Sequence, residues 1–91
     1  MTGIASWYAW HPGEAAAGPA LRAALGPGWR GATVAVCRTD GGAMACVHVV
    51  LSGWCACGDR NGVPTVIDLD AASFAALMPL SRGLVTVEVV P

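Results

Sequence analysis

One internal echo constrains the fold of this chain more than any single element does. Residues 23–31 (AALGPGWRG) and 75–83 (AALMPLSRG) both run from a helix end through a proline turn to Arg-Gly. Each copy then leads into a valine-rich strand of alternating pattern. A repeat at about half the chain length indicates two related halves. Two interlocked halves can close into a small barrel, which has no exposed strand edge, so we expect a mainly β fold with pseudo-twofold symmetry.

The composition supports one compact domain over residues 1–91. Hydrophobic residues make up 55% of the chain and charged residues 12%, which excludes disorder because ample apolar surface is available for burial. The net charge is −1, and the arginines are scattered singly rather than clustered. Since nucleic-acid binding requires clustered cations, we expect no nucleic-acid partner.

Neither a membrane span nor a signal peptide is predicted. Residues 41–58 carry no Asp, Glu, Lys or Arg, but they include His48, Ser52 and Gly53 and many β-branched residues, which favours a buried strand followed by a loop. The first four residues lack the basic and apolar regions of a secretory signal, so we expect no signal peptide in this chain.

Periodicity and turn signals predict a coarse order of elements. Asp40-Gly41-Gly42 is a hairpin signal, and Asp70 is a natural N-cap for the helix that follows it. The predicted strands cover residues 4–10, 31–37, 44–52, 65–69 and 84–90, and the predicted helices cover residues 20–25 and 71–78.

The hairpin pattern predicts which side of its strands is dry. By the period of two, one face carries Val34, Val36, Val47, Val49 and Leu51. The opposite face includes the two hairpin cysteines and His48, which we expect to be a hydrogen-bonded partner on a wetter surface. Pairing around the turn sets Cys37 opposite Cys46.

Four cysteines in so short a chain suggest disulfide bridges that form in an oxidising compartment. A bridge within Cys55-Ala56-Cys57 would close a strained ring, so we expect Cys37 and Cys46 each to bridge one of these two loop cysteines. A four-cysteine zinc site is the rival, although Cys-x-Cys is not the usual knuckle spacing. Free thiols are a further alternative in a reducing compartment. We expect no metal and no cofactor.

Aromatic residues near the first strand and in the loop after residue 53 are candidates for a sugar platform. Trp7, Tyr8, Trp10 and Trp54 could stack on sugar C–H faces while their polar tips bind hydroxyls. The alternative is that some of them are simply core residues. His11 could contact a ligand or act as a base, or it could be a surface turn residue beside Pro12.

Four short motifs carry a family resemblance. Residues 5–8 (ASWY), 54–57 (WCAC), 66–69 (VIDL) and 83–87 (GLVTV) resemble, in this order, the rare lipoprotein A-like and expansin-like double-psi β-barrels of phage or actinobacterial type. The resemblance implies a small six-stranded double-psi β-barrel with two short helices. It also implies a groove that takes a glycan strand, which is peptidoglycan in the bacterial branch, where some members are lytic transglycosylases.

The same resemblance assigns a role to Asp68. It matches the family aspartate of the Ile-Asp-Leu motif, which looks like the general acid of glycan cleavage, and Asp59 is the nearby acid that could assist. The alternative is that Asp68 accepts backbone amides where the strand meets the helix. Gly53 and the stretch around Arg22 stand where the family has an acidic residue and a histidine, so two groups of the lytic members are missing.

The prediction is a domain that binds peptidoglycan or a related polysaccharide, with an impaired or altered lytic site if it is active. The alternative is a non-catalytic component of a phage tail or capsid, whose partners would be other virion proteins. A third reading is an inhibitor or effector that presents the stapled loop to a protein. The expected location is extracellular, at the cell envelope, or in a virion.

Overall fold

The computed structural model describes residues 1–40 and 44–91 of the chain. The centre of the predicted hairpin turn, Gly41 and Gly42, lies outside these residues. The described elements, in chain order, are β1 (Thr2–Tyr8), β2 (Glu14–Ala17), α1 (Pro19–Leu25), β3 (Thr33–Arg38), β4 (Cys46–Trp54), β5 (Asp59–Arg60), β6 (Val63–Asp70), α2 (Ala71–Leu77), the 3₁₀ helix η1 (Leu80–Arg82) and β7 (Val85–Val90).

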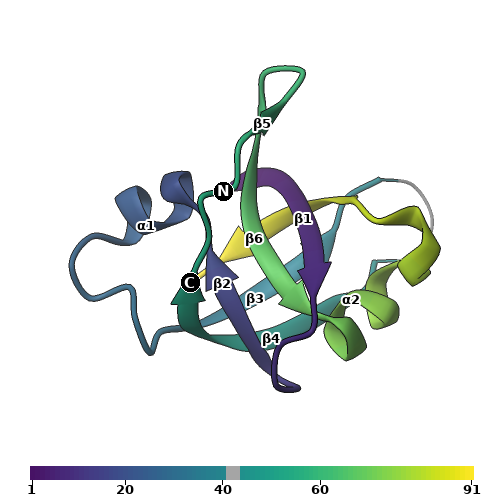
Figure 1. Cartoon of the computed structure of the whole chain (residues 1–91), viewed down its shortest axis with the longest axis horizontal. Coiled ribbons are helices and arrows are strands. Elements are labelled where there is room, and N and C mark those ends of the chain that lie inside the picture. The colour runs from purple at the N-terminus through teal and green to yellow at the C-terminus, as the bar shows by residue number, and fades with distance from the viewer. Residues whose placement is uncertain (41–43) are drawn as a thin grey trace.

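Six strands close into a barrel. Their order is β1-β7-β3-β4-β2-β6, and a parallel pairing of β6 with β1 completes the ring. The two-residue strand β5 pairs only with β6, and together they form a hairpin that projects from one end of the barrel (Figure 1). The predicted fold class, a small six-stranded double-psi β-barrel with two short helices, is confirmed.

The strand pairing has the pseudo-twofold symmetry that the sequence echo indicated. Exchanging β1 with β4, β2 with β6 and β3 with β7 reproduces every pairing of the ring. The parallel pair β1–β6 becomes the parallel pair β4–β2, and the other pairs stay antiparallel. The two helices, of seven residues each, are exchanged as well. Each parallel pair contains one register shift, between Ile4 and Ala5 in the first pair and between Ala15 and Ala16 in the second.

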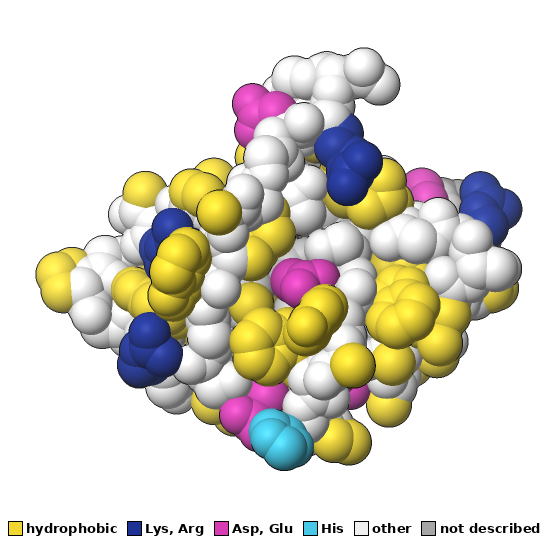
Figure 2. Space-filling model, in the orientation of Figure 1, with side chains coloured by type: hydrophobic (Ala, Val, Ile, Leu, Met, Phe, Trp, Pro, Cys, Tyr) yellow, Lys and Arg dark blue, Asp and Glu magenta, His cyan; other side chains and the backbone are white. Residues whose placement is uncertain are grey.

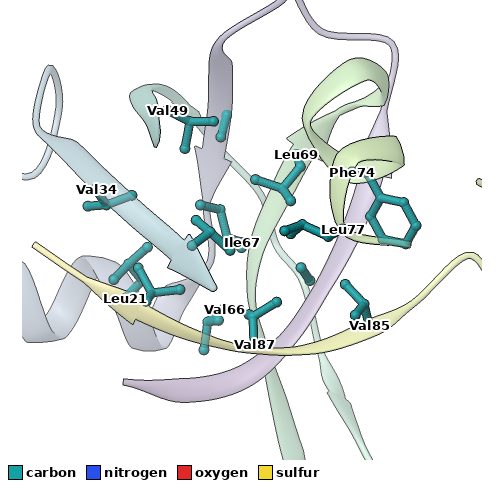
Figure 3. Close-up of a cluster of buried hydrophobic side chains, with 14 of the residues drawn as sticks. Leu21, Val34, Val49, Val66, Ile67, Leu69, Phe74, Leu77, Val85 and Val87 are labelled. Carbon is teal, nitrogen blue, oxygen red and sulfur yellow. The ribbon is translucent and has the colours of Figure 1, made fainter. Parts of the chain in front are cut away.

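The interior is filled by aliphatic side chains from both halves, together with Phe74 of α2 (Figure 3). The predicted dry face of the β3–β4 hairpin is confirmed, because four of its five members are at most 1% exposed and Val47 is partly buried. Leu77 and Met78 of the second helix are buried with Phe74, as their spacing predicted. On β7, alternate valines point inward in the same way.

One strand of the ring was not predicted. β2 has the sequence Glu-Ala-Ala-Ala, whose residues have low strand propensity. Its three alanines are fully buried, and the strand is paired with β4 on one side and with β6 on the other. The first strand also ends earlier than predicted, because the chain turns after Tyr8, where Trp10 N donates to Tyr8 O at 2.8 Å. Trp10 therefore lies beyond β1.

Candidate functional site

Asp68 lies on the outside of the barrel and is held by a serine from the neighbouring strand. Its neighbours on β6, Ile67 and Leu69, are fully buried, whereas Asp68 is partly exposed. Asp68 is in register with Ser6 of β1, and Ser6 Oγ donates to Asp68 Oδ1 at 2.7 Å. The carboxylate that accepts a helix amide is that of Asp70, whose Oδ2 receives Ser73 N at 3.0 Å. Asp68 therefore is not the helix cap.

Two aromatic side chains continue this outer surface. Tyr8 is two residues after Ser6 on β1, so by the strand period it points to the same side, and it is 60% exposed. The Tyr8 ring centroid is 5.6 Å from that of Trp10, with a tilt of 60° between the ring planes. The Trp10 indole nitrogen is buried and has no hydrogen-bond partner among the described residues. The two rings form a tilted aromatic pair.

Trp10 rests on a glycine. A Cβ atom placed on Gly53 would lie 3.0 Å from Trp10 Cη2, so the ring occupies the space that any side chain at this position would take. Gly53 pairs with Ala16 of β2, which in turn pairs with Asp68. Two strand spacings, roughly 10 Å, therefore separate the Gly53 and Asp68 backbones. This contact was missed from the sequence, although a glycine within a strand is a known sign of close approach.

Trp7 and Trp54 occupy equivalent places in the two halves. Trp7 follows Ser6 on β1 and pairs with Leu69, while Trp54 follows Gly53 on β4 and pairs with Ala17. Trp7 is 37% exposed, and its indole nitrogen donates to the backbone oxygen of Leu80 at 3.0 Å. Trp54 is 58% exposed. Each tryptophan lies one position after the row formed by Ser6, Asp68, Ala16 and Gly53, so by the strand period it points to the opposite side of the sheet from Asp68.

Arg22 of α1 fastens the loop that follows β4. Its Nη1 atom donates to Ala17 O at 2.7 Å and to Cys55 O at 3.0 Å. Its guanidinium carbon is 5.3 Å from the centroid of the Trp54 ring, which is the distance of a cation–π contact. This arginine lies in the stretch where the family resemblance implied a histidine. It positions Trp54 by holding the backbone of Cys55, which follows Trp54, and of Ala17, which pairs with it.

The cysteine pairing predicted from the sequence is wrong. Two bridges form, as predicted, but they join Cys37 to Cys46 and Cys55 to Cys57. The first pair is in register across β3 and β4, with the Cα atoms 4.0 Å apart. In the second pair the Cα atoms are 5.1 Å apart, within the usual range for a bridge, so the loop accommodates the small ring that we took to be too strained.

The other candidate residues do not join the Asp68 surface. Asp59 is exposed on β5 and pairs with Pro64. Pro64 precedes Asp68 by four positions on β6, which corresponds to roughly 13 Å of strand. His11 is exposed in the turn before β2, where its backbone oxygen accepts from Glu14 N. The structure therefore does not bring the second acid to Asp68, and the described residues show no hydrogen bond between His11 and Asp68.

The face that contains β6, β1 and β2 shows an acidic side chain among hydrophobic side chains (Figure 2). The part of the chain that the structure describes forms no pocket, so this face is an open surface. Within residues 1–40 and 44–91, no three His, Cys, Asp or Glu side chains gather as metal ligands would. None of the helices described is long and apolar enough to cross a membrane.

Comparison with known proteins does not assign a family. No protein-family model matches the sequence, and no curated protein sequence matches it. The likeness to the rare lipoprotein A-like and expansin-like barrels is thus a prediction from four short motifs, and the function has to be argued from the surface around Asp68.

Proposed function

We propose that the protein binds a polysaccharide, of which peptidoglycan of the cell wall is the leading candidate. The proposed site is the Asp68 surface, which consists of Ser6, Tyr8, Trp10 and Asp68. The observation that carries the proposal is the Ser6–Asp68 hydrogen bond of 2.7 Å on an outer face that also carries the exposed Tyr8 ring, which packs on the partly buried Trp10. The site of action would then be the cell envelope, the extracellular space or a virion.

The chemistry of a sugar fits each part of this surface. Pyranose rings present C–H faces, which pack on aromatic rings, and the tyrosine hydroxyl can exchange hydrogen bonds with sugar hydroxyls. Ser6 orients the carboxylate of Asp68 through Oδ1, while Oδ2 contacts no donor among the described residues. That oxygen can accept a sugar hydroxyl, and hydrogen bonds to charged groups are the stronger kind.

The geometry favours binding over cleavage. Glycoside hydrolysis usually uses two carboxyl groups at a defined separation of about 5 to 10 Å. Asp59 is farther from Asp68 than this, because its pairing partner Pro64 lies roughly 13 Å from Asp68 along β6. Gly53, where the resemblance implied an acid, has no side chain and is covered by Trp10. If the chain cleaves glycan, Asp68 has to act as the acid without a partner carboxylate from these two positions.

A pull-down with insoluble peptidoglycan tests the proposal. We expect the wild-type chain to sediment with the polymer, and we expect Asp68→Asn and Tyr8→Ala each to weaken binding about tenfold, the effect of one hydrogen bond to a charged group or one stacking contact. Asp59→Asn is the matched control for charge, and Met44→Ala, at 82% exposed, is the control for an exposed apolar side chain. Both controls should bind as the wild type does.

Two results would overturn the proposal: failure of the wild-type chain to bind any cell-wall polymer, or equal losses in Asp59→Asn and Asp68→Asn. The first result would favour the alternative role as a structural component of a virion. Zymography on the same polymer addresses cleavage separately. Clearing by the wild type that disappears in Asp68→Asn, and persists in Asp59→Asn, would extend the proposal from binding to catalysis.

A further inference from the structure

The two disulfides have different structural settings. Cys37 and Cys46 are held opposite each other by the β3–β4 ladder, so their sulfur atoms stay close even if the bond between them breaks. Cys55 and Cys57 lie in the loop between β4 and β5, outside any strand, and the described residues show no hydrogen bond to Cys57. A bridge that encloses a single residue removes less entropy from the unfolded chain than a bridge across a longer loop. The second bridge therefore contributes less to the stability of the barrel than the first.

The charges beside the two bridges differ as well. Arg22 Nη1 donates to the backbone oxygen of Cys55 at 3.0 Å, so a permanent positive charge is held against the backbone of this cysteine, and Arg22 forms no ion pair among the described residues. Arg38, next to Cys37, is paired instead with Asp40 at 2.8 Å. A neighbouring unpaired cation stabilises a thiolate, and it makes that sulfur the better leaving group.

We propose that Cys55–Cys57 is a thiol–disulfide exchange site that reacts with an external dithiol. A thiolate of the dithiol attacks Cys57 Sγ and forms a mixed disulfide, and the Sγ–Sγ bond breaks with its electron pair passing to Cys55 Sγ beside Arg22. The second thiol of the dithiol then attacks the other dithiol sulfur, which is bonded to Cys57 Sγ in the mixed disulfide, and releases Cys57. The dithiol is oxidised to a disulfide, and the protein pair gains two electrons and two protons.

This inference does not rest on polysaccharide binding, because it concerns the loop and α1 rather than the Asp68 surface. Opening of the bridge would also affect Trp54, because Trp54 directly precedes Cys55 and Arg22 lies over the Trp54 ring. Other charged groups near the loop come from β5, where Asp59 and Arg60 are exposed and of opposite sign. Arg22 contacts the backbone of Cys55, whereas Asp59 lies two residues after Cys57, so we expect Cys55 to be the leaving sulfur.

Graded reduction of the full chain tests the proposal. The protein is treated with dithiothreitol, quenched by alkylation at intervals and mapped by mass spectrometry, while circular dichroism reports whether the barrel stays folded. We expect Cys55–Cys57 to open at least tenfold faster than Cys37–Cys46 in protein that remains folded. In the half-reduced protein, Cys55 should alkylate faster than Cys57 at pH 7. Return of oxidised dithiothreitol should close the bridge again.

Variants of Arg22 separate its charge from its packing. Arg22→Gln should slow opening of the Cys55–Cys57 bridge by about tenfold and move the pH midpoint of Cys55 alkylation upward, whereas Arg22→Lys, which retains the charge, should restore much of both. Arg82→Gln, which changes an exposed arginine of η1, is the matched control and should have no effect. Opening of both bridges at one rate, faster alkylation of Cys57, or an Arg22→Gln variant with wild-type kinetics would each overturn the proposal.

Discussion

Trp10 packs its ring directly against Gly53, at a distance so short that the ring would have to shift to admit a Cβ atom. The built Cβ would lie 3.0 Å from Cη2 and 3.5 Å from both Cζ2 and Cζ3. The position also has ordinary backbone geometry, since Gly53 is not among the glycines with positive φ. Gly53 therefore makes space for the indole ring and is not needed for its backbone conformation. This contact fixes the position of Trp10 on the Asp68 surface.

Gly53→Ala should displace the Trp10 ring and destabilise the protein. Alanine alone would stiffen the unfolded chain and favour folding slightly, but overpacking against a ring costs about 1 to 3 kcal/mol. We expect a net loss of about 1 kcal/mol in the free energy of unfolding, measured by urea denaturation, together with a change in tryptophan fluorescence of the native state. The control is Gly58→Ala, where a Cβ meets nothing within 4 Å. Equal stability of both variants would contradict the contact.

Local sequence patterns predicted the parts of this fold that depend on near neighbours. The alternating valines predicted the buried face of the β3–β4 hairpin and the inward side of β7. Asp70 was identified as a cap because its residue type suits a helix start that follows a strand. The echo predicted two halves because both copies retain the helix end and the turn into the next strand.

Long-range register decided what local patterns could not predict. The alanines of β2 form a strand because they pair with β4 on one side and β6 on the other. Local strand propensity cannot predict such long-range pairing. The seating of Trp10 on Gly53 depends on how a turn and a distant strand meet. The cysteine pairing could not be predicted from spacing, because it depends on a bend of the loop that brings the Cα atoms of Cys55 and Cys57 to 5.1 Å.

Asp70→Ala should destabilise the protein by about 1 kcal/mol, the usual effect of losing an N-cap. Asp70 Oδ2 accepts Ser73 N at 3.0 Å, while Oδ1 is buried without a partner among the described residues. Asp70→Asn should cost less, because an amide oxygen can still accept the helix N–H. Urea denaturation measures both values. Ser73→Ala, which leaves the donating backbone amide in place, is the control, and a loss equal to that of Asp70→Ala would argue against the cap.

Removal of the two bridges should have unequal effects on stability. In the chain-entropy model the ten-residue loop of Cys37–Cys46 corresponds to about 2.7 kcal/mol and the three-residue loop of Cys55–Cys57 to about 1.6 kcal/mol. The double variant Cys37→Ser/Cys46→Ser should therefore lose more free energy of unfolding than Cys55→Ser/Cys57→Ser. Urea denaturation of the two double variants under the same conditions measures the difference. The reverse order would show that the loop bridge has a structural role beyond chain entropy.

The stability of the chain should depend on pH through Glu88. A hydrogen bond of 2.7 Å from the Thr2 hydroxyl, followed by the hydrogen bond and charge of the N-terminal ammonium at 3.3 Å, lowers the pKa of Glu88 below its usual value. A carboxylate whose pKa is lower in the folded state stabilises the fold at pH values above its unfolded pKa, and this contribution is lost as the pH falls through the folded pKa.

Glu88→Gln should therefore be less stable than the wild type at pH 7, and the difference should vanish in strong acid. Thr2→Val, which removes the first donor, should lose part of the same pH-dependent difference in urea denaturation at a series of pH values. A Glu88→Gln deficit that stays constant from pH 7 to strong acid would assign the effect to packing instead of charge.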